Sequence, residues 1–409
     1  MSKVVIVGGG AAGMLASVYA ARNGHEVHVL EKNEKLGKKL YITGKGRCNL
    51  TNACGREELF SAVMRNRKFL YSAFYTYGPD EVMDFFEKAG VSLKIERGNR
   101  VFPCSDHSSD IIRALTDQMK RAGVHIHLHT EAAGIMEENG QASGVRLSDG
   151  RILKGDHVIV ATGGLSYPST GSTGDGYRFA EETGHKVTQR TPSLVPLHTK
   201  EDYIPKLQGL SLRNVKLTIK KEKKTLYQDF GEMLFTHQGV SGPLVLSASA
   251  VIADQLEKGE LKAWVDLKPA LSLEQLDARI LREFEKGQNK QFKNVIHVLF
   301  PSSLTPVMLP LGGIDPDKPV HDISKEQRKA FGALVKAFPF TITGMGEFKE
   351  AIITRGGVSV KDIQPGTMES RKLSHLYFIG EVLDLDALTG GFNLQIAWST
   401  AYLAAMALS

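Results

Sequence analysis

Three side chains of the sequence have the chemistry to take part in proton or electron transfer. Cys48 follows Arg47 in the segment GKGRCN, and a neighbouring cation would lower the pKa of the thiol. His237, in FTHQGVSGP, has the pKa range of a proton donor. Arg355, in TRGGV, could bind an anionic or carbonyl substrate. We take His237, Cys48 and Arg355 as catalytic candidates. The alternatives are packing for the cysteine, a structural role for the histidine and an ion pair for the arginine.

The remaining cysteines and histidines form no motif for a disulfide or a metal. Three cysteines are too few and too scattered for a disulfide framework, and no Cys-x-x-Cys indicates a disulfide reductase. No Cys/His cluster has zinc spacing. His125, His127 and His129 alternate along a predicted strand, where we expect a solvated strand face. The sequence therefore predicts no metal site.

A glycine-rich turn near the start of the chain carries the strongest functional signal. The apolar run Val4–Val7 meets Gly8-x-Gly10-x-x-Gly13, a helical pattern follows, and a second apolar strand ends on Glu31. Gly8 permits the tight turn, Gly10 lets the backbone approach a pyrophosphate, and Gly13 lets the helix pack on the sheet. The helix N-terminus attracts phosphates, and Glu31 can accept hydrogen bonds from an adenosine ribose. The pattern predicts a dinucleotide site, for NAD(P) or FAD.

Two later segments favour FAD. Val158–Gly164 (VIVATGG) is a buried strand that runs into small residues, which let the backbone approach a cofactor. Leu376–Asn393 ends an apolar strand at Gly380, continues with acidic residues and opens a helix at Gly391. An acid there could bind ribitol, and the helix dipole could face the isoalloxazine, whose reduced form carries negative charge. A plain NAD enzyme has no need for this third element.

A basic loop between the first two segments completes the predicted cofactor site. Residues 32–52 hold six cations against one acid, and their glycines allow tight folding around a pyrophosphate or the flavin pyrimidine. A solvated basic loop is the alternative, although loops of this length are usually functional or disordered. The predicted cofactor-binding residues are Gly8, Gly10, Ala12, Gly13, Glu31, Lys32, Lys39, Gly44, Arg47, Cys48, Asn49, Ala133, Thr162, Gly163, Gly380, Asp384, Gly391, Phe392 and Asn393.

Composition is typical of a globular protein with a large core. The 409 residues suggest two or three domains, and 42% are hydrophobic and 23% charged. The net charge of +6 suits an anionic ligand and leaves an RNA substrate open. No apolar run reaches the ~18–20 residues that a membrane span needs. A strand predicted to begin at residue 3 leaves no room for a signal peptide, so we expect a cytoplasmic location.

The order of elements predicts an α/β protein with a discontinuous Rossmann-like domain. Helices are predicted over 58–90, 110–122 and 393–408, and the sheet begun at residue 3 is unfinished at residue 190. Residues 193–266 read as alternating strands with a basic turn, KKEKK, and the final strand and helix supply the missing piece of the first sheet. The predicted domains are an FAD-binding domain (1–190 plus 343–409), an inserted β-rich substrate domain (191–270 plus 333–342) and a helical subdomain (271–332).

Segments along nearly the whole chain carry a family resemblance. They are VVIVGGGAAG, EKNEKLGKKLYITGKGRCNLTN, GNRVFPCSDHSSDII, VIVATGG, FTHQGVSGPLVLSAS, TRGGVSVKDI, TMESRKL and LYFIGEVLDLDALTGGFNLQIAWSTA. In this order they resemble the BaiN/RdsA/YhiN-type family of FAD-dependent oxidoreductases. The resemblance implies extended FAD, a barrel-like inserted domain, and reduction of activated C=C bonds, including steroid enones and an RNA uridine. Gly380-Glu381 stands where many FAD enzymes carry Gly-Asp, which makes Asp384 the alternative ribitol contact.

These observations predict an enzyme that passes hydride from NAD(P)H through FAD to an electron-poor C=C bond. No second GxGxxG provides a separate nicotinamide domain, so the nicotinamide would bind transiently over the flavin or another donor would serve. Reduction of uridine to dihydrouridine in ribosomal RNA and oxidation of an amine by O2 are the alternatives, as is a flavin-stabilised binding protein without turnover. The partner is a small molecule or RNA, and the sequence leaves the oligomeric state open.

Overall fold

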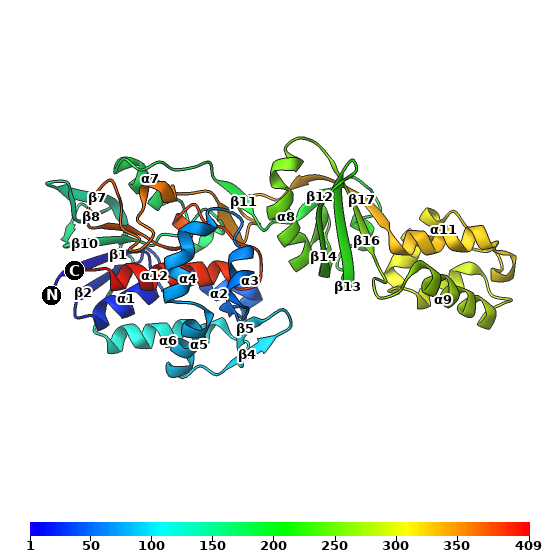
Figure 1. Cartoon of the computed structure of the whole chain (residues 1–409), viewed down its shortest axis with the longest axis horizontal. Helices are drawn as coiled ribbons and strands as arrows, with labels where there is room; N and C mark the ends of the chain where they lie inside the picture. Colours follow the sequence, from blue (N-terminus) through cyan, green and yellow to red (C-terminus); the bar gives the residue numbers. More distant parts are fainter. The chain divides into compact units, whose positions relative to one another are not determined.

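The computed structural model describes all 409 residues and divides them into two compact units (Figure 1). Unit 1 comprises Met1–Ser193 and Phe348–Ser409, so both ends of the chain belong to it. Unit 2 comprises Leu194–Glu347. None of the helices combines the length and the apolar composition that a membrane crossing needs.

A five-stranded parallel sheet forms the centre of unit 1. Its strands follow the order β19-β10-β1-β2-β6, and helix α1 (Ala11–Arg22) connects β1 to β2. The chain moves from β1 to one side first and adds β10 and β19 on the other side later. Ligands of such sheets bind beyond the carboxyl ends of the strands, where the order reverses. The strands are β1 (Lys3–Val7), β2 (Glu26–Leu30), β6 (His125–His127), β10 (His157–Val160) and β19 (Leu376–Phe378).

Helix α12 (Phe392–Met406) packs beside α1 and is buried over most of its length (Figure 1). Its Trp398 is fully buried and donates the indole N–H to the Leu50 carbonyl at 2.8 Å. This bond ties the helix to the basic loop, so the loop and the start of α12 are held by one core. The other helices of unit 1 are α2 (Lys38–Ile42), α3 (Arg56–Ser61), α4 (Tyr71–Thr76), α5 (Pro79–Lys88), α6 (Ser108–Arg121) and α7 (Asp175–Glu182).

Smaller antiparallel sheets complete unit 1. One has the order β3-β5-β4, one has the order β7-β8-β9, and β11 pairs with β18. The last pair joins the two chain segments that flank unit 2 in the sequence. The strands are β3 (Thr51–Asn52), β4 (Leu93–Glu96), β5 (Arg100–Pro103), β7 (Ala132–Glu138), β8 (Gln141–Leu147), β9 (Ile152–Lys154), β11 (Thr191–Ser193) and β18 (Ile353–Arg355).

Unit 2 is a closed six-stranded barrel with helices. The barrel order is β12-β15-β14-β13-β16-β17, and α8 (Pro243–Leu256) packs against β14. A capping box precedes the first helix after β16, because the Ser272 hydroxyl accepts from the Gln275 N–H. The strands are β12 (Leu197–Thr199), β13 (Ser211–Lys221), β14 (Lys224–Phe235), β15 (Gly239–Ser241), β16 (Leu261–Asp266) and β17 (Phe338–Met345). The remaining helices are α9 (Leu273–Lys286), α10 (Thr305–Gly312) and α11 (Lys325–Lys336).

Two local expectations were wrong. Residues 243–256 form α8 within the region predicted to be all strand, because Pro243 starts a helix well and the apolar run after it does not alternate. The region predicted to be helical over 58–90 does hold helices, namely α3, α4 and α5, with a break at Asn66, whose φ is +55°, and a new start at Pro79. The basic loop contains α2 and β3 rather than being irregular throughout.

Candidate cofactor site

The turn between β1 and α1 needs its glycines for two different reasons. Gly8 has φ +111°, and a Cβ there would lie 2.4 Å from the Ala161 carbonyl oxygen of the neighbouring strand end. A Cβ at Gly13 would lie 1.9 Å from the Gly8 carbonyl oxygen, so both positions exclude a side chain. Gly10 is the N-cap of α1, and a Cβ there would meet no atom within 4 Å. Open space therefore faces the free N–H groups of α1, as a pyrophosphate requires.

Glu31, at the end of β2, is buried and held against this turn. Its Oε2 accepts from the Gly9 N–H at 3.0 Å, and its Oε1 accepts from the backbone N–H of Asn33 at 2.9 Å and from its side-chain amide at 2.6 Å. Oε2, which accepts one hydrogen bond from the protein, keeps a further lone pair. The acid is thus fixed beside the glycine turn in the position that ribose recognition requires.

A Lys39–Glu381 ion pair joins the basic loop to the segment after β19. Lys39 Nζ lies 2.5 Å from Glu381 Oε2 and 2.5 Å from Ser166 Oγ. Glu381 Oε1 accepts from Ser166 Oγ and from the Thr354 N–H at 2.9 Å. Four segments that are distant in the sequence therefore meet at one carboxylate. Lys39, Ser166 and Thr354 thus hold the Glu381 carboxylate within the protein.

The start of α12 is pressed against β3. Gly391 has φ +98°, and a Cβ there would lie 2.3 Å from the Thr51 carbonyl oxygen. Asn52 donates its side-chain N–H to the Gly390 carbonyl at 2.9 Å. Asn393 accepts from the Ala387 N–H and donates to the Ala387 carbonyl, so its side chain holds the preceding loop. Phe392, the first residue of α12, is buried.

Buried polar atoms without a hydrogen-bond partner lie in the predicted cofactor segments. They include Asn49 Oδ1 and Asn52 Oδ1 near the end of the basic loop and Thr162 Oγ1 just after β10. Because native structures pair nearly all buried polar atoms, such atoms mark positions where a ligand supplies the partner. Together with the open space at Gly10, they show that the residues of this site fit a dinucleotide such as FAD.

The acids after β19 are held by one arginine. Arg65 lies 3.1 Å from Asp384 Oδ1 and 3.1 Å from Asp386 Oδ1. Burial raises the pKa of Asp386, and the charges of Arg65 and Arg355 act against this rise. Asp384 is therefore part of a charge cluster within the protein, and its predicted ribitol contact stays a prediction.

The structure contradicts the expected activation of Cys48. Arg47 forms ion pairs with Glu96 and with Asp106, the latter at 2.6 Å, and its guanidinium lies 4.2 Å from the centre of the Phe102 ring. Its charge is thereby neutralised. Cys48 is fully buried, and burial raises the pKa of its thiol to about 12. The thiol is protonated at neutral pH, so an acidic, reactive Cys48 is the wrong interpretation.

Two other predicted contacts are engaged within unit 1. Lys32 Nζ lies 2.7 Å from Asp175 Oδ2 and also donates to Thr173 Oγ1, so its charge is paired. The Ala133 carbonyl accepts from Arg178 at 2.6 Å. Gly44 and Gly163, with φ +57° and +73°, shape the backbone turns at which they lie.

The other catalytic candidates lie in different units. Arg355 ends β18 in unit 1, where the strand pairs with β11. His237 is exposed in the turn between β14 and β15 of unit 2. Their roles stay predictions. Sequence reasoning missed Arg65, Asn52 and Ser166. Arg65 lies outside the predicted cofactor segments, whereas Asn52 ends the basic loop and Ser166 follows the Val158–Gly164 segment, so these segments were identified without these two side chains.

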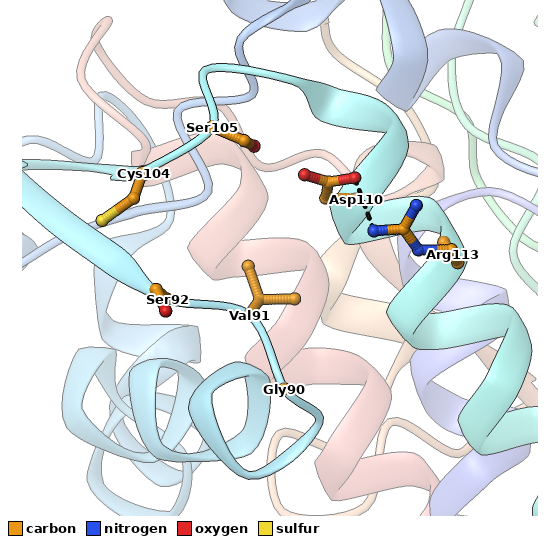
Figure 2. Close-up of a pocket in the computed structure, with 7 residues that line it drawn as sticks. All are labelled: Gly90, Val91, Ser92, Cys104, Ser105, Asp110 and Arg113. Atoms are coloured by element: carbon orange, nitrogen blue, oxygen red, sulfur yellow. Dashed lines mark hydrogen bonds and ion pairs between the residues drawn. The ribbon is translucent and has the colours of Figure 1, made fainter.

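A separate pocket of about 290 Å³ lies on unit 1 (Figure 2). Asp110 and Arg113 form an ion pair at 2.8 Å at its edge. None of its lining residues belongs to the predicted cofactor segments. The lining residues are Gly90, Val91, Ser92, Cys104, Ser105, Asp110 and Arg113.

Comparison with known proteins decides the family. Residues 2–407 match the model described as "HI0933-like protein Rossmann domain". The chain belongs to this family. It is 32% identical to the "3-dehydro-bile acid delta(4,6)-reductase" of Clostridium scindens, over 100% of this chain and 99% of the relative. It is 30% identical to the "Ribosomal RNA dihydrouridine synthase" of Escherichia coli, over 99% and 97% of the two chains.

Solved structures agree on the fold. The 3-ketosteroid delta1-dehydrogenase of Sterolibacterium denitrificans matches with a TM-score of 0.55 at 13% identity, over 99% of this chain and 98% of that one. The resemblance inferred from the sequence, the Rossmann-type fold class with a barrel, and the assignment as an FAD-dependent oxidoreductase are confirmed.

Proposed function

We propose that this protein is a reductase that passes hydride from NAD(P)H, by way of FAD, to an electron-poor C=C bond of its substrate. The observation that supports the proposal is the glycine turn at the carboxyl end of β1, which leaves open space beside Gly10 and holds Glu31 against the Gly9 N–H. The names of the two relatives support the reaction class, because a delta(4,6)-reductase and a dihydrouridine synthase both saturate a C=C bond.

The residues at the switch point would hold FAD in an extended pose. The N–H groups after Gly10 would bind the pyrophosphate, and Glu31 would bind the adenosine ribose. The first N–H groups of α12 would face the isoalloxazine, where their dipole favours added negative charge. Bound FAD would supply hydride transfer to and from its isoalloxazine ring. The Lys39–Glu381 pair keeps the surrounding segments rigid.

Two side chains are the candidates for acting on the substrate. Arg355, at the end of β18 in unit 1, would bind its carbonyl or anionic group and so draw electron density from the C=C bond. His237 has the chemistry of a proton donor and is exposed in the β14–β15 turn of unit 2. Cys48 has no part in this scheme, because its buried thiol stays protonated.

The donor is tested by mixing the FAD-loaded protein with NADH or NADPH without oxygen or substrate. We expect one of them to bleach the visible absorption of oxidised flavin at least as fast as the enzyme turns over. If neither bleaches it and dithionite does, the nicotinamide assignment fails. Product analysis after adding a steroid enone, or an unmodified ribosomal RNA fragment, then identifies the substrate.

A surface of the barrel favours RNA as the second candidate substrate. Lys220 and Lys262 face each other on β13 and β16, and Trp264 lies opposite Thr218 on the same outward face. Lys220 Nζ lies 5.8 Å from the centre of the Trp264 ring. Aromatic rings among cations bind single-stranded nucleic acids by stacking and phosphate contacts. RNA affinity that falls steeply with salt, and is lost in Trp264→Ala, would support uridine reduction. RNA binding that is absent or independent of salt would leave a small enone as the candidate substrate.

A further inference from the structure

Three histidines and a glutamate gather at the edge of the parallel sheet. Strands β2 and β6 are neighbours in parallel register, and His28 pairs with His125. Alternate residues of a strand share a face, so Glu26 and His28 of β2 project to the same side as His125 and His127 of β6. The sequence predicted only a solvated strand face, because two members of the cluster come from the distant β2.

The rings are stacked and linked by hydrogen bonds. The His28 ring lies 4.6 Å from that of His125 and 5.1 Å from that of His127, with angles of 19° and 14° between their planes. His28 Nε2 lies 2.8 Å from Glu26 Oε1, and His28 Nδ1 lies 2.9 Å from His127 Nε2. The His28 side chain is only 10% exposed. One ligand atom from each of Glu26, His28 and His125 lies within 4.8 Å of the others.

We propose that this cluster binds a divalent transition metal, with Zn²⁺ as the best match to its ligands. Glu26 would give a carboxylate oxygen, His28 its Nε2 and His125 one ring nitrogen, and water would complete a tetrahedron. Tetrahedral Zn²⁺ accepts two histidines and one carboxylate with its ligands about 2.0–2.2 Å from the ion. Ligand atoms at that distance from a tetrahedral ion lie about 3.3–3.6 Å from one another. The three atoms here lie within 4.8 Å of one another, so the exposed His125 side chain would turn toward the ion on binding.

His127 would orient a metal ligand without binding the metal itself. A histidine that binds a metal through one nitrogen usually donates its other N–H to a fixed acceptor, which sets its orientation. With a metal on His28 Nε2, the Nδ1–H of His28 would donate to His127 Nε2, which lies 2.9 Å from Nδ1.

The charged group that competes for this site is Lys3. Its Nζ lies 3.2 Å from Glu26 Oε1, in an ion pair whose two side chains are both partly exposed. Such pairs contribute little to stability, so the flexible lysine can swing into solvent when a cation binds the carboxylate. The metal would link β2 to β6, the three-residue edge strand. No residue of the cluster belongs to the predicted cofactor site.

The test uses the full-length, FAD-loaded protein after removal of metals by a chelator. Titration with Co²⁺, followed by Zn²⁺, is expected to show one ion per chain, with the visible bands of tetrahedral Co²⁺ lost as Zn²⁺ displaces it. Zn²⁺ is also expected to raise the unfolding temperature. Absence of stoichiometric binding in the unmodified protein overturns the proposal.

Variants assign the ligands without disturbing the core. His127→Ala removes the partner of a ligand and is expected to lower the Zn²⁺ affinity about 10–100-fold. His125→Ala removes a ligand itself and is expected to lower the affinity by more than that. His125 is exposed, so its replacement leaves the core intact. His129→Asn is the matched control, because His129 has φ +51° in the next turn and asparagine tolerates that conformation. Unchanged affinity in His125→Ala, or an equal loss in His129→Asn, overturns the assignment. The flavin spectrum reports that each variant is folded.

Discussion

Gly10, the N-cap of α1, and Gly13, in its first turn, lie three residues apart, yet the structure predicts opposite results when each becomes alanine. At Gly10 the backbone has φ −84°, which alanine adopts freely, and the new methyl group meets no atom within 4 Å. Unfolding of the FAD-free protein should change by at most about 1 kcal/mol, the scale of an N-cap substitution. The methyl group would instead occupy the space in front of α1 that the pyrophosphate needs.

The expected loss in Gly10→Ala is therefore one of affinity. A hydrogen bond from a backbone N–H to a charged group contributes about 1.5–3 kcal/mol. Since about 1.4 kcal/mol is tenfold in affinity, the loss of one such bond weakens FAD roughly 10–150-fold. Gly13→Ala puts its methyl group 1.9 Å from the Gly8 carbonyl oxygen, and overpacking of this kind costs about 1–3 kcal/mol of stability.

The assay pairs urea unfolding of the FAD-free protein with FAD titration followed by flavin fluorescence. Gly55→Ala is the control, because Gly55 is the N-cap of α3 with φ −67° and has no atom within 4 Å of a built Cβ. It should match Gly10→Ala in stability and the unmodified protein in FAD affinity. Full FAD affinity in Gly10→Ala, or full stability in Gly13→Ala, would refute the reasoning.

Three further predictions concern groups whose partners the structure defines. Lys39→Met leaves the Glu381 carboxylate partly buried without its cation, so urea unfolding should show a loss of about 1–3 kcal/mol, partly restored by Glu381→Gln in the same chain. Iodoacetamide should label the exposed Cys104 of the folded protein, detected by mass spectrometry, and leave the buried, protonated Cys48 unmodified. Burial lowers the pKa of His185 below 6.5, so the unfolded state takes up the proton first and stability falls as the pH drops below 6.5. His185→Gln should reduce that fall, by at most about 1.4 kcal/mol per pH unit in urea titrations.

Each of the three has an outcome that contradicts it. Equal stability of Lys39→Met and the unmodified protein would mean that the ion pair is dispensable. Equal labelling of both thiols would contradict the burial of Cys48. An acid-stability curve unchanged in His185→Gln would place the titrating groups elsewhere.

Local sequence patterns were enough to predict the nucleotide-binding core. The strand–glycine–helix–strand–acid order around Gly8 and Glu31 specifies a parallel βαβ unit, and the strand ending at Gly380 identified the distant part of the same sheet. The functional glycines could be identified from the sequence because the need for a residue without a Cβ is a local steric one. Gly8, Gly13 and Gly391 all have a backbone oxygen where a Cβ would stand.

Contacts between distant segments could not be predicted in the same way. The cation beside Cys48 indicated an acidic thiol, but Glu96 and Asp106 neutralise Arg47, and only the fold brings them there. The metal-ligand set at His125 likewise depends on the pairing of β2 with β6. Helix α8 was not predicted, because an apolar run without alternation fits a buried helix and a buried strand equally well.

The most direct test of the central proposal is the oxidation of the reduced flavin by substrate. The FAD-loaded protein is reduced with dithionite without oxygen and mixed with a steroid enone or an unmodified ribosomal RNA fragment, while the flavin absorption and the product are followed. We predict that the absorption of oxidised flavin returns with one of them, in step with saturation of one C=C bond per flavin. The proposed reduction would be contradicted if the flavin stayed reduced with both the enone and the RNA fragment. Reoxidation by O2, followed by reduction by an amine, would then identify an oxidase.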